Sequence, residues 1–178
     1  MTSLMPHEFQ NPYFKRHDSL AYNYRMPEIC AAIGLGQLKK LKTLVNKRMI
    51  IASYYNEAVK SCNWLQSQFV DENIIHSYWT YVLRIDEDHT NISWDIFRDQ
   101  FIKNGGESFY GAWSLCYLEP ALEGLSFKQN NIRFEKGLCP IAEKVQPALI
   151  QLKTNFEDLN YGRKQAEILQ KTINDLNV

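Results

Sequence analysis

A long apolar pattern at helical spacing limits the folds open to this chain. From Met26 onward, apolar residues recur at intervals of three and four, which places their side chains on one face of an α-helix. Pro27 suits the first turn, where a missing N–H costs nothing. The pattern continues to about Cys62, and Gly34 and Gly36 interrupt it. We expect one long helix in which the glycines admit another backbone, or two helices with a break between them.

The rest of the chain alternates between predicted strands and helices. Period-two alternation and short apolar runs predict strands at 76–85, 107–110 and 148–152. Helix-start signals are Ser93 as an N-cap, Pro140 in a first turn, and a helical pattern from about Asn160. Gly105 and Gly106 are expected to end the helix after Ser93 in left-handed conformations. This order predicts an α+β fold, with a long helix followed by a small, mainly antiparallel sheet that has helices packed on one face.

The first 25 residues differ from the remainder. They contain Pro6, Pro12 and several aromatic side chains, and they show no helical period. We expect residues 1–25 to form an extended aromatic arm and residues 26–178 to form one domain. An arm this aromatic is expected to pack against something outside the chain.

Composition excludes several classes of function. Twenty Lys and Arg balance twenty Asp and Glu, so the chain has no basic excess to bind a nucleic-acid backbone. No run reaches the roughly 18 apolar residues of a membrane span, and the N-terminus does not resemble a secretory signal. The four cysteines show no CxxC spacing, which predicts no zinc site and reduced thiols in a cytoplasmic protein.

No motif in the chain carries chemistry by itself. Gly34-Leu35-Gly36 lacks the third glycine of a dinucleotide loop, and HExxH, GxSxG and SxxK are absent from the sequence. We therefore predict no metal site and no catalytic residue from motifs alone.

Residues 21–38 read AYNYRMPEICAAIGLGQL. This segment resembles the stretch GYNYRM-xE-xxAA-x-GL-x-QL of the DegT/DnrJ/EryC1/StrS family of pyridoxal-phosphate (PLP)-dependent aminotransferases. Residues 77–81, 105–120, 139–143 and 152–155 are similar to later segments of the same family in the same order. The resemblance covers nearly all of this chain and only the C-terminal half of such an enzyme.

The resemblance implies a fold and an activity. It implies the small C-terminal domain of a fold-type I PLP-dependent transferase, and transfer of an amino group, with glutamate as the expected donor, to a nucleotide-linked keto sugar. The histidine of the family's "PLH" loop is absent, because Ser114-Leu115-Cys116 stands there. That departure leaves the sugar unassigned.

The family's Schiff-base lysine lies upstream of the segment that matches residues 21–38, as does the acid that pairs with the pyridinium nitrogen. Transamination needs that amine to hold the cofactor and to move a proton, and it needs the acid so that the ring can accept electrons. We therefore predict that this chain alone binds PLP weakly or not at all and is inactive.

Candidate site residues follow from the resemblance. It implies that Asn23 binds the PLP phosphate of the neighbouring subunit and that Arg25 meets an oxyanion, since a guanidinium fork matches one. His17 and Tyr110 are further candidates for binding substrate. An asparagine before a helix is also a common turn former, and Tyr110, with Trp113 and Tyr117, could line a nucleotide-sugar cleft or merely cover the sheet.

Two classes of function remain open. In the first, the chain is a fragment or one piece of a split aminotransferase that acts as a homodimer or with a complementing PLP-binding domain. In the second, it is a non-catalytic module that binds a protein through the aromatic arm.

Overall fold

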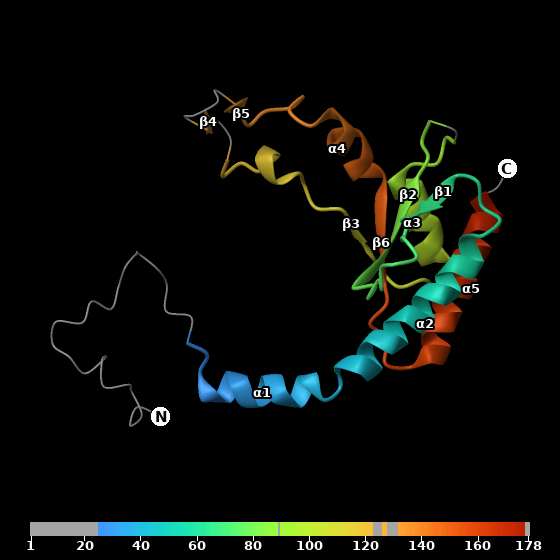
Figure 1. Cartoon of the computed structure of the whole chain (residues 1–178). Helices are drawn as coiled ribbons and strands as arrows, with labels where there is room; N and C mark the ends of the chain where they lie inside the picture. The colour runs from blue at the N-terminus through green and yellow to red at the C-terminus, as the bar shows by residue number, and fades with distance from the viewer. Residues whose placement is uncertain (1–24, 89, 123–125, 128–131, 177–178) are drawn as a thin grey trace. The chain divides into compact units, whose positions relative to one another are not determined.

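The computed structural model describes the chain except for residues 1–24, 89, 123–125, 128–131 and 177–178 (Figure 1). Its contacts define two compact units, residues 1–39 and residues 40–178. The first unit contributes helix α1 (Glu28–Leu38), and all other helices and strands belong to the second.

The long helical pattern forms two helices. Helix α1 ends at Leu38, and α2 (Leu41–Val59) begins after a turn at Lys39 and Lys40. The break that we expected near the glycines therefore comes after them, because both glycines lie inside α1. Among the described residues none approaches either glycine, since a Cβ added at Gly34 or Gly36 would meet nothing of theirs within 4 Å.

A four-stranded antiparallel sheet lies at the centre of the second unit. Its strands, in spatial order, are β1 (Leu65–Ser67), β2 (Thr80–Ile85), β6 (Leu149–Lys153) and β3 (Tyr110–Gly111). Strands β2 and β6 are neighbours although about 70 residues separate them along the chain. Strand β1 was not predicted, and β2 begins four residues later than expected.

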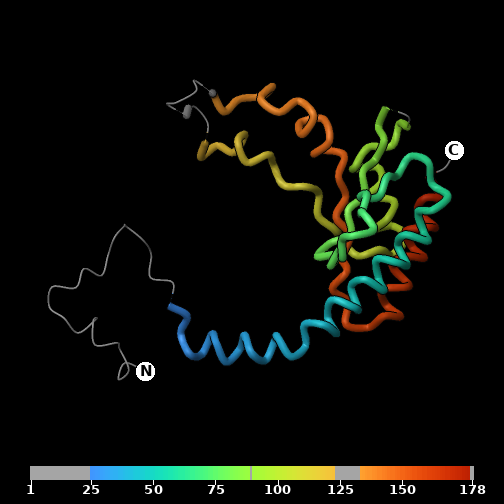
Figure 2. Tube along the Cα trace, viewed as in Figure 1, coloured from blue at the N-terminus to red at the C-terminus, as the bar shows by residue number. Residues whose placement is uncertain are grey.

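The remaining elements of the second unit are α3 (Trp94–Lys103), η2 (Cys116–Leu118), β4 (Ser126–Phe127), β5 (Ile132–Arg133), α4 (Pro140–Val145), η3 (Gln146–Ala148) and α5 (Leu159–Leu176). The trace in Figure 2 leaves the sheet after β3 and returns through α4 and η3 to β6. Strands β4 and β5 pair with each other and not with the main sheet.

One face of the sheet is buried under helices. Alternate residues of β2 and β6 are buried, and they include Leu83 and Ile150 at 0% exposure. They share one hydrophobic core with Ile51 of α2, Phe97 of α3 and Leu169 of α5. The α+β prediction, with helices on one face of a small antiparallel sheet, is confirmed.

Helices α2 and α5 pack closely where Gly162 faces Ile51. A Cβ added at Gly162 would lie 2.7 Å from Cγ1 of Ile51, which is too close for two carbon atoms. The core side of α2 is also tied to the sheet, because the Tyr55 hydroxyl donates to the Lys153 carbonyl oxygen at 3.0 Å. These contacts fix α2 and α5 against the sheet.

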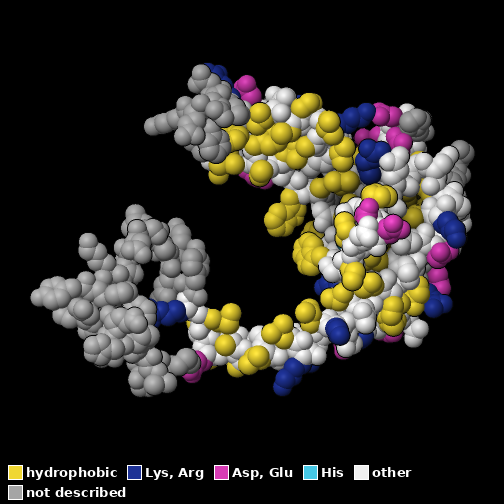
Figure 3. Space-filling view, in the orientation of Figure 1, with side chains coloured by type: hydrophobic (Ala, Val, Ile, Leu, Met, Phe, Trp, Pro, Cys, Tyr) yellow, Lys and Arg dark blue, Asp and Glu magenta, His cyan; other side chains and the backbone are white. Residues whose placement is uncertain are grey.

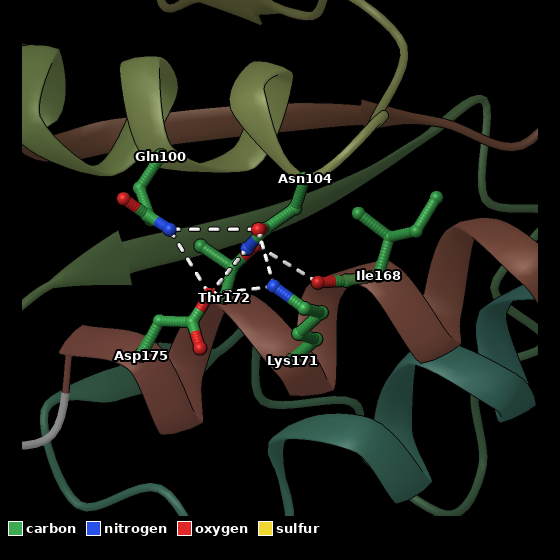
Figure 4. Close-up of polar contacts among 6 residues, drawn as sticks. All are labelled: Gln100, Asn104, Ile168, Lys171, Thr172 and Asp175. Carbon is green, nitrogen blue, oxygen red and sulfur yellow. Dashed lines mark hydrogen bonds and ion pairs between the residues drawn. The ribbon is translucent and has the colours of Figure 1, made fainter.

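Polar side chains join the C-terminal ends of α3 and α5 (Figure 4). The Asn104 amide donates to the Thr172 hydroxyl at 3.0 Å and to the Asp175 carboxylate at 2.9 Å. Lys171 donates to the Asn104 side-chain oxygen at 2.6 Å and pairs with Asp175 at 2.9 Å. Thr172 is fully buried, so this cluster satisfies polar groups at the edge of the core.

Two predicted helix boundaries are confirmed around α3. The Ser93 hydroxyl accepts from the Ile96 N–H at 3.3 Å and so caps the first turn. After the helix, Gly105 has a φ of 90°, a conformation that glycine adopts without strain. The prediction for Gly106 is wrong, because its φ is not positive.

Candidate functional site

An aromatic pocket lies within the second unit and has a volume of about 680 Å³. The described residues that line it are Arg48, Trp79, Thr80, Tyr110, Trp113, Gln151, Lys153 and Asn155. They come from α2, from the three strands β2, β6 and β3, from the residue that precedes β2, and from the segments that follow β3 and β6.

The floor of the aromatic pocket is the sheet face opposite the core. Successive side chains of a strand point to opposite faces, so Thr80 lies on the face away from buried Tyr81. Thr80 pairs with Lys153, and Gln151 pairs with Tyr110 in the antiparallel register. The sheet register therefore brings polar and aromatic side chains together on one surface.

Three large rings stand exposed at this pocket. Trp79 is 75% exposed, Tyr110 is 65% exposed and Trp113 is 85% exposed. The backbone beside Trp113 is held in place, because the Gln146 side chain donates to the Ala112 carbonyl oxygen at 2.9 Å. Exposed rings next to polar side chains are suited to stacking on a planar ligand.

Both charged side chains among the described lining residues are cationic. Arg48 is one, and Lys153 is the other. Lys153 Nζ lies 2.8 Å from Glu107 Oε2, and the Tyr161 hydroxyl donates to Glu107 Oε1 at 2.8 Å. The hydrogen bonds from Lys153 and then Tyr161 hold the pKa of Glu107 below its usual range. The ion pair with Glu107 thereby holds the Lys153 side chain at the pocket wall.

The aromatic pocket by itself does not fit PLP. Its lysine, Lys153, is bound to a carboxylate at 2.8 Å, whereas a Schiff base needs a neutral amine that can attack a carbonyl. The described lining residues contain no carboxylate to pair with a pyridinium nitrogen.

The structure describes two of the four predicted site residues. Tyr110 lies in the aromatic pocket. Arg25 is exposed and precedes α1, in the unit that does not contain the pocket. Asn23 and His17 lie outside the described residues.

Tyr117 does not line the aromatic pocket. It is buried, and its hydroxyl donates to Glu143 Oε1 at 2.5 Å. Glu143 also accepts from the N–H groups of Gly137 at 2.8 Å and Cys139 at 3.3 Å. Burial and the Glu143 carboxylate raise the pKa of Tyr117 to about 12. Tyr117 therefore stabilises the loop that enters α4.

Sequence reasoning named only Tyr110 and Trp113 among the lining residues and missed the others, which include Trp79, Arg48 and Lys153. The strand expected from residue 76 placed Trp79 on the same face as Tyr81, but Trp79 is exposed. The cause is Tyr78, which has a φ of 47° and so interrupts the alternation before β2 begins. The signals present in the sequence were only a tryptophan at a strand end and cations on neighbouring elements.

Two solved aminotransferases contain the fold of this chain as part of a longer one. An aminotransferase from Psychrobacter cryohalolentis is similar over 94% of this chain and 44% of its own, with a TM-score of 0.71 and 21% identity. DesI, solved with its TDP-sugar product, is similar over 83% of this chain and 36% of its own, with a TM-score of 0.62 and 20% identity.

The model of the DegT/DnrJ/EryC1/StrS aminotransferase family matches residues 2–160. The chain belongs to this family, which confirms the resemblance found in residues 21–38. GDP-perosamine synthase from Vibrio cholerae is 30% identical over 129 residues, which are 68% of this chain and 34% of that protein. The chain thus spans about a third of the length of this relative.

The described residues contain neither a cluster of metal-ligating side chains nor a membrane-spanning helix. No group of three or more His, Cys, Asp or Glu side chains gathers there as a metal site would require. In the same part of the chain, no helix has both the length and the apolar character that crossing a bilayer requires.

Proposed function

We propose that this chain supplies the nucleotide-sugar-binding part of a PLP-dependent aminotransferase that acts on a nucleotide-linked keto sugar. The observation that carries the proposal is the aromatic pocket, on a chain whose residues 2–160 match the aminotransferase family. We propose GDP as the nucleotide of the substrate, because a relative with 30% identity is named for a GDP-linked sugar. Glutamate is the proposed amino donor.

The pocket suits the nucleotide end of such a substrate. Tyr110 and Trp113 offer planar faces on which a base can stack. Lys153 places a positive charge in the same pocket, and its ammonium can bind a diphosphate oxygen. A ligand that is aromatic at one end and anionic in the middle satisfies both features.

The cofactor end of the site is proposed to come from elsewhere. When bound, PLP supplies the electron sink that transamination requires. Asn23 is proposed to donate to the cofactor phosphate of a neighbouring subunit, and Arg25 and His17 to contact the substrate. The partner is either a second copy of the chain or a complementing PLP-binding domain.

Labelling with PLP tests the proposal that this chain has no lysine that forms a specific Schiff base. The purified chain is incubated with PLP, reduced with borohydride and digested, and the lysines that carry a pyridoxyl group are mapped by mass spectrometry. We expect only scattered labelling at low yield and no amino transfer from glutamate. Stoichiometric labelling of a single lysine, abolished when that lysine is replaced by arginine, would contradict the proposal.

A second candidate function is a non-catalytic module that binds another protein. The exposed apolar side chains of α1, among them Ile29 at 76% and Ile33 at 61%, favour it. The two functions differ in nucleotide binding, because only the first requires the aromatic pocket to recognise GDP.

A further inference from the structure

The turn that precedes β2 is strained at Tyr78. Its φ of 47° lies in the left-handed region, which a bulky side chain adopts at an energetic cost. Tyr78 is the one described non-glycine residue with a positive φ. Strain of this kind persists only where surrounding contacts over-determine it, and it gathers at functional sites.

Two side chains from distant segments hold the turn. Thr154 is fully buried, and its hydroxyl lies 2.6 Å from the Tyr78 carbonyl oxygen and 3.2 Å from that of Trp79. Arg48 Nη1 donates to the Trp79 carbonyl oxygen at 2.6 Å and to the Thr154 hydroxyl at 3.3 Å. On the other side of the turn, His76 Nδ1 accepts from the Tyr78 N–H at 2.9 Å. We use the name Trp79 latch for Arg48, Thr154 and the turn that these two residues hold.

The Trp79 latch fixes the backbone of a residue whose ring remains in solvent. Trp79 is 75% exposed and lines the aromatic pocket, so its ring gains little from burial. Because the backbone that carries the ring is held before any ligand arrives, only rotation about the side-chain bonds of Trp79 remains to be lost, which reduces the entropy cost of binding. The arrangement fixes the point at which the ring is attached to the chain and leaves the ring uncovered.

We propose that Arg48 and Thr154 are positioning residues that hold Trp79 as the stacking surface for the base of the bound nucleotide. This inference rests on the proposed function, in which the aromatic pocket binds a nucleoside diphosphate. Arg48 acts in two ways, because it holds the Trp79 carbonyl oxygen and also adds positive charge beside an anionic ligand. Thr154 acts only through the turn, since it is buried and is not among the lining residues.

The test uses the full chain labelled with 5-fluorotryptophan, so that each of the four tryptophans gives a fluorine resonance. Trp79→Phe assigns the Trp79 resonance. Thr154→Val removes the hydroxyl and keeps the shape, and Thr154→Ser keeps the hydroxyl. Thr172→Val is the matched control, because Thr172 is also fully buried and its hydroxyl donates to a backbone carbonyl at 2.8 Å, in α5.

We expect Thr154→Val to shift or broaden the Trp79 resonance and to leave the resonances of buried Trp64 and of Trp94 in place. GDP should bind the Thr154→Val variant about tenfold more weakly, as expected if one stacking contact is lost. Thr154→Ser should restore the Trp79 resonance and the affinity for GDP. Thr172→Val should change the melting temperature but neither the Trp79 resonance nor the affinity for GDP. Arg48→Lys should also move the Trp79 resonance.

An unchanged Trp79 resonance and unchanged GDP affinity in Thr154→Val would overturn the inference. The proposed function fails separately if GDP does not bind the unaltered chain at all. In that case the fluorine resonance alone decides whether Arg48 and Thr154 position Trp79.

Discussion

At the scale of single residues, Gly162 shows how little space remains between α2 and α5. Glycine inside a helix usually costs about 1 kcal/mol relative to alanine, so Gly162→Ala would stabilise a free helix. Here the added Cβ would lie 2.7 Å from Ile51. We expect the free energy of unfolding to fall by roughly 1–3 kcal/mol, the usual cost of overpacking, as measured by urea denaturation.

The matched control is Gly36→Ala in α1, where an added Cβ meets no atom of the described part of the chain within 4 Å. This variant should be as stable as the parent or slightly more stable. If Gly162→Ala behaved in the same way as Gly36→Ala, the close packing of α2 on α5 would be wrong.

At the scale of elements, the cluster between α3 and α5 makes stability depend on pH. Hydrogen bonds from Lys171 and then Asn104 hold the pKa of Asp175 below its ordinary value of 3.8. The folded state therefore prefers the ionised carboxylate more strongly than the unfolded state does. This contribution is complete above the unfolded pKa and is lost as the pH falls through the lower, folded pKa.

Asp175→Asn should therefore unfold at lower urea concentration than the parent at pH 7, and the difference should shrink as the pH falls below about 4. Glu167→Gln, an exposed acid-to-amide change on the same helix, serves as the control and should show neither effect. A gap between Asp175→Asn and the parent that widens in acid would contradict the assignment.

Elements whose signals are local were predictable from the sequence. Ser93 caps α3, Gly105 ends it, and Pro140 begins α4, each through chemistry contained within a few residues. The turn before β2 was not predictable, because its geometry depends on Arg48 and Thr154, which are 31 and 75 residues from Trp79. The family segment at residues 21–38 revealed the class of protein. The aromatic pocket could not be predicted in the same way, because its residues come together only through the register of the sheet.

At the scale of the whole molecule, α1 lacks the burial that its composition requires. The helix is apolar on all sides, yet none of its residues is buried, and hydrophobic side chains run along it in Figure 3. A helix of this kind normally lies inside a protein. We expect the 178-residue chain, on its own, to associate or to bind a hydrophobic dye.

Ile33→Glu should reduce association in sedimentation velocity, because it places a charge on α1. Ile141→Glu is the control, since Ile141 is 81% exposed but lies in α4. A strictly monomeric parent that binds no dye would contradict this expectation. So would association that weakens equally in both variants.

The central claim is that this chain carries the nucleotide end of a sugar aminotransferase site in its aromatic pocket. Calorimetric titration with GDP tests it most directly, with Trp113→Ala as the pocket variant and Phe69→Ala as the control, because both side chains are 85% exposed and only Trp113 lines the pocket. The account predicts one GDP per chain, bound about tenfold more weakly after Trp113→Ala and equally well after Phe69→Ala. Absence of binding, or equal affinity in all three proteins, would contradict it.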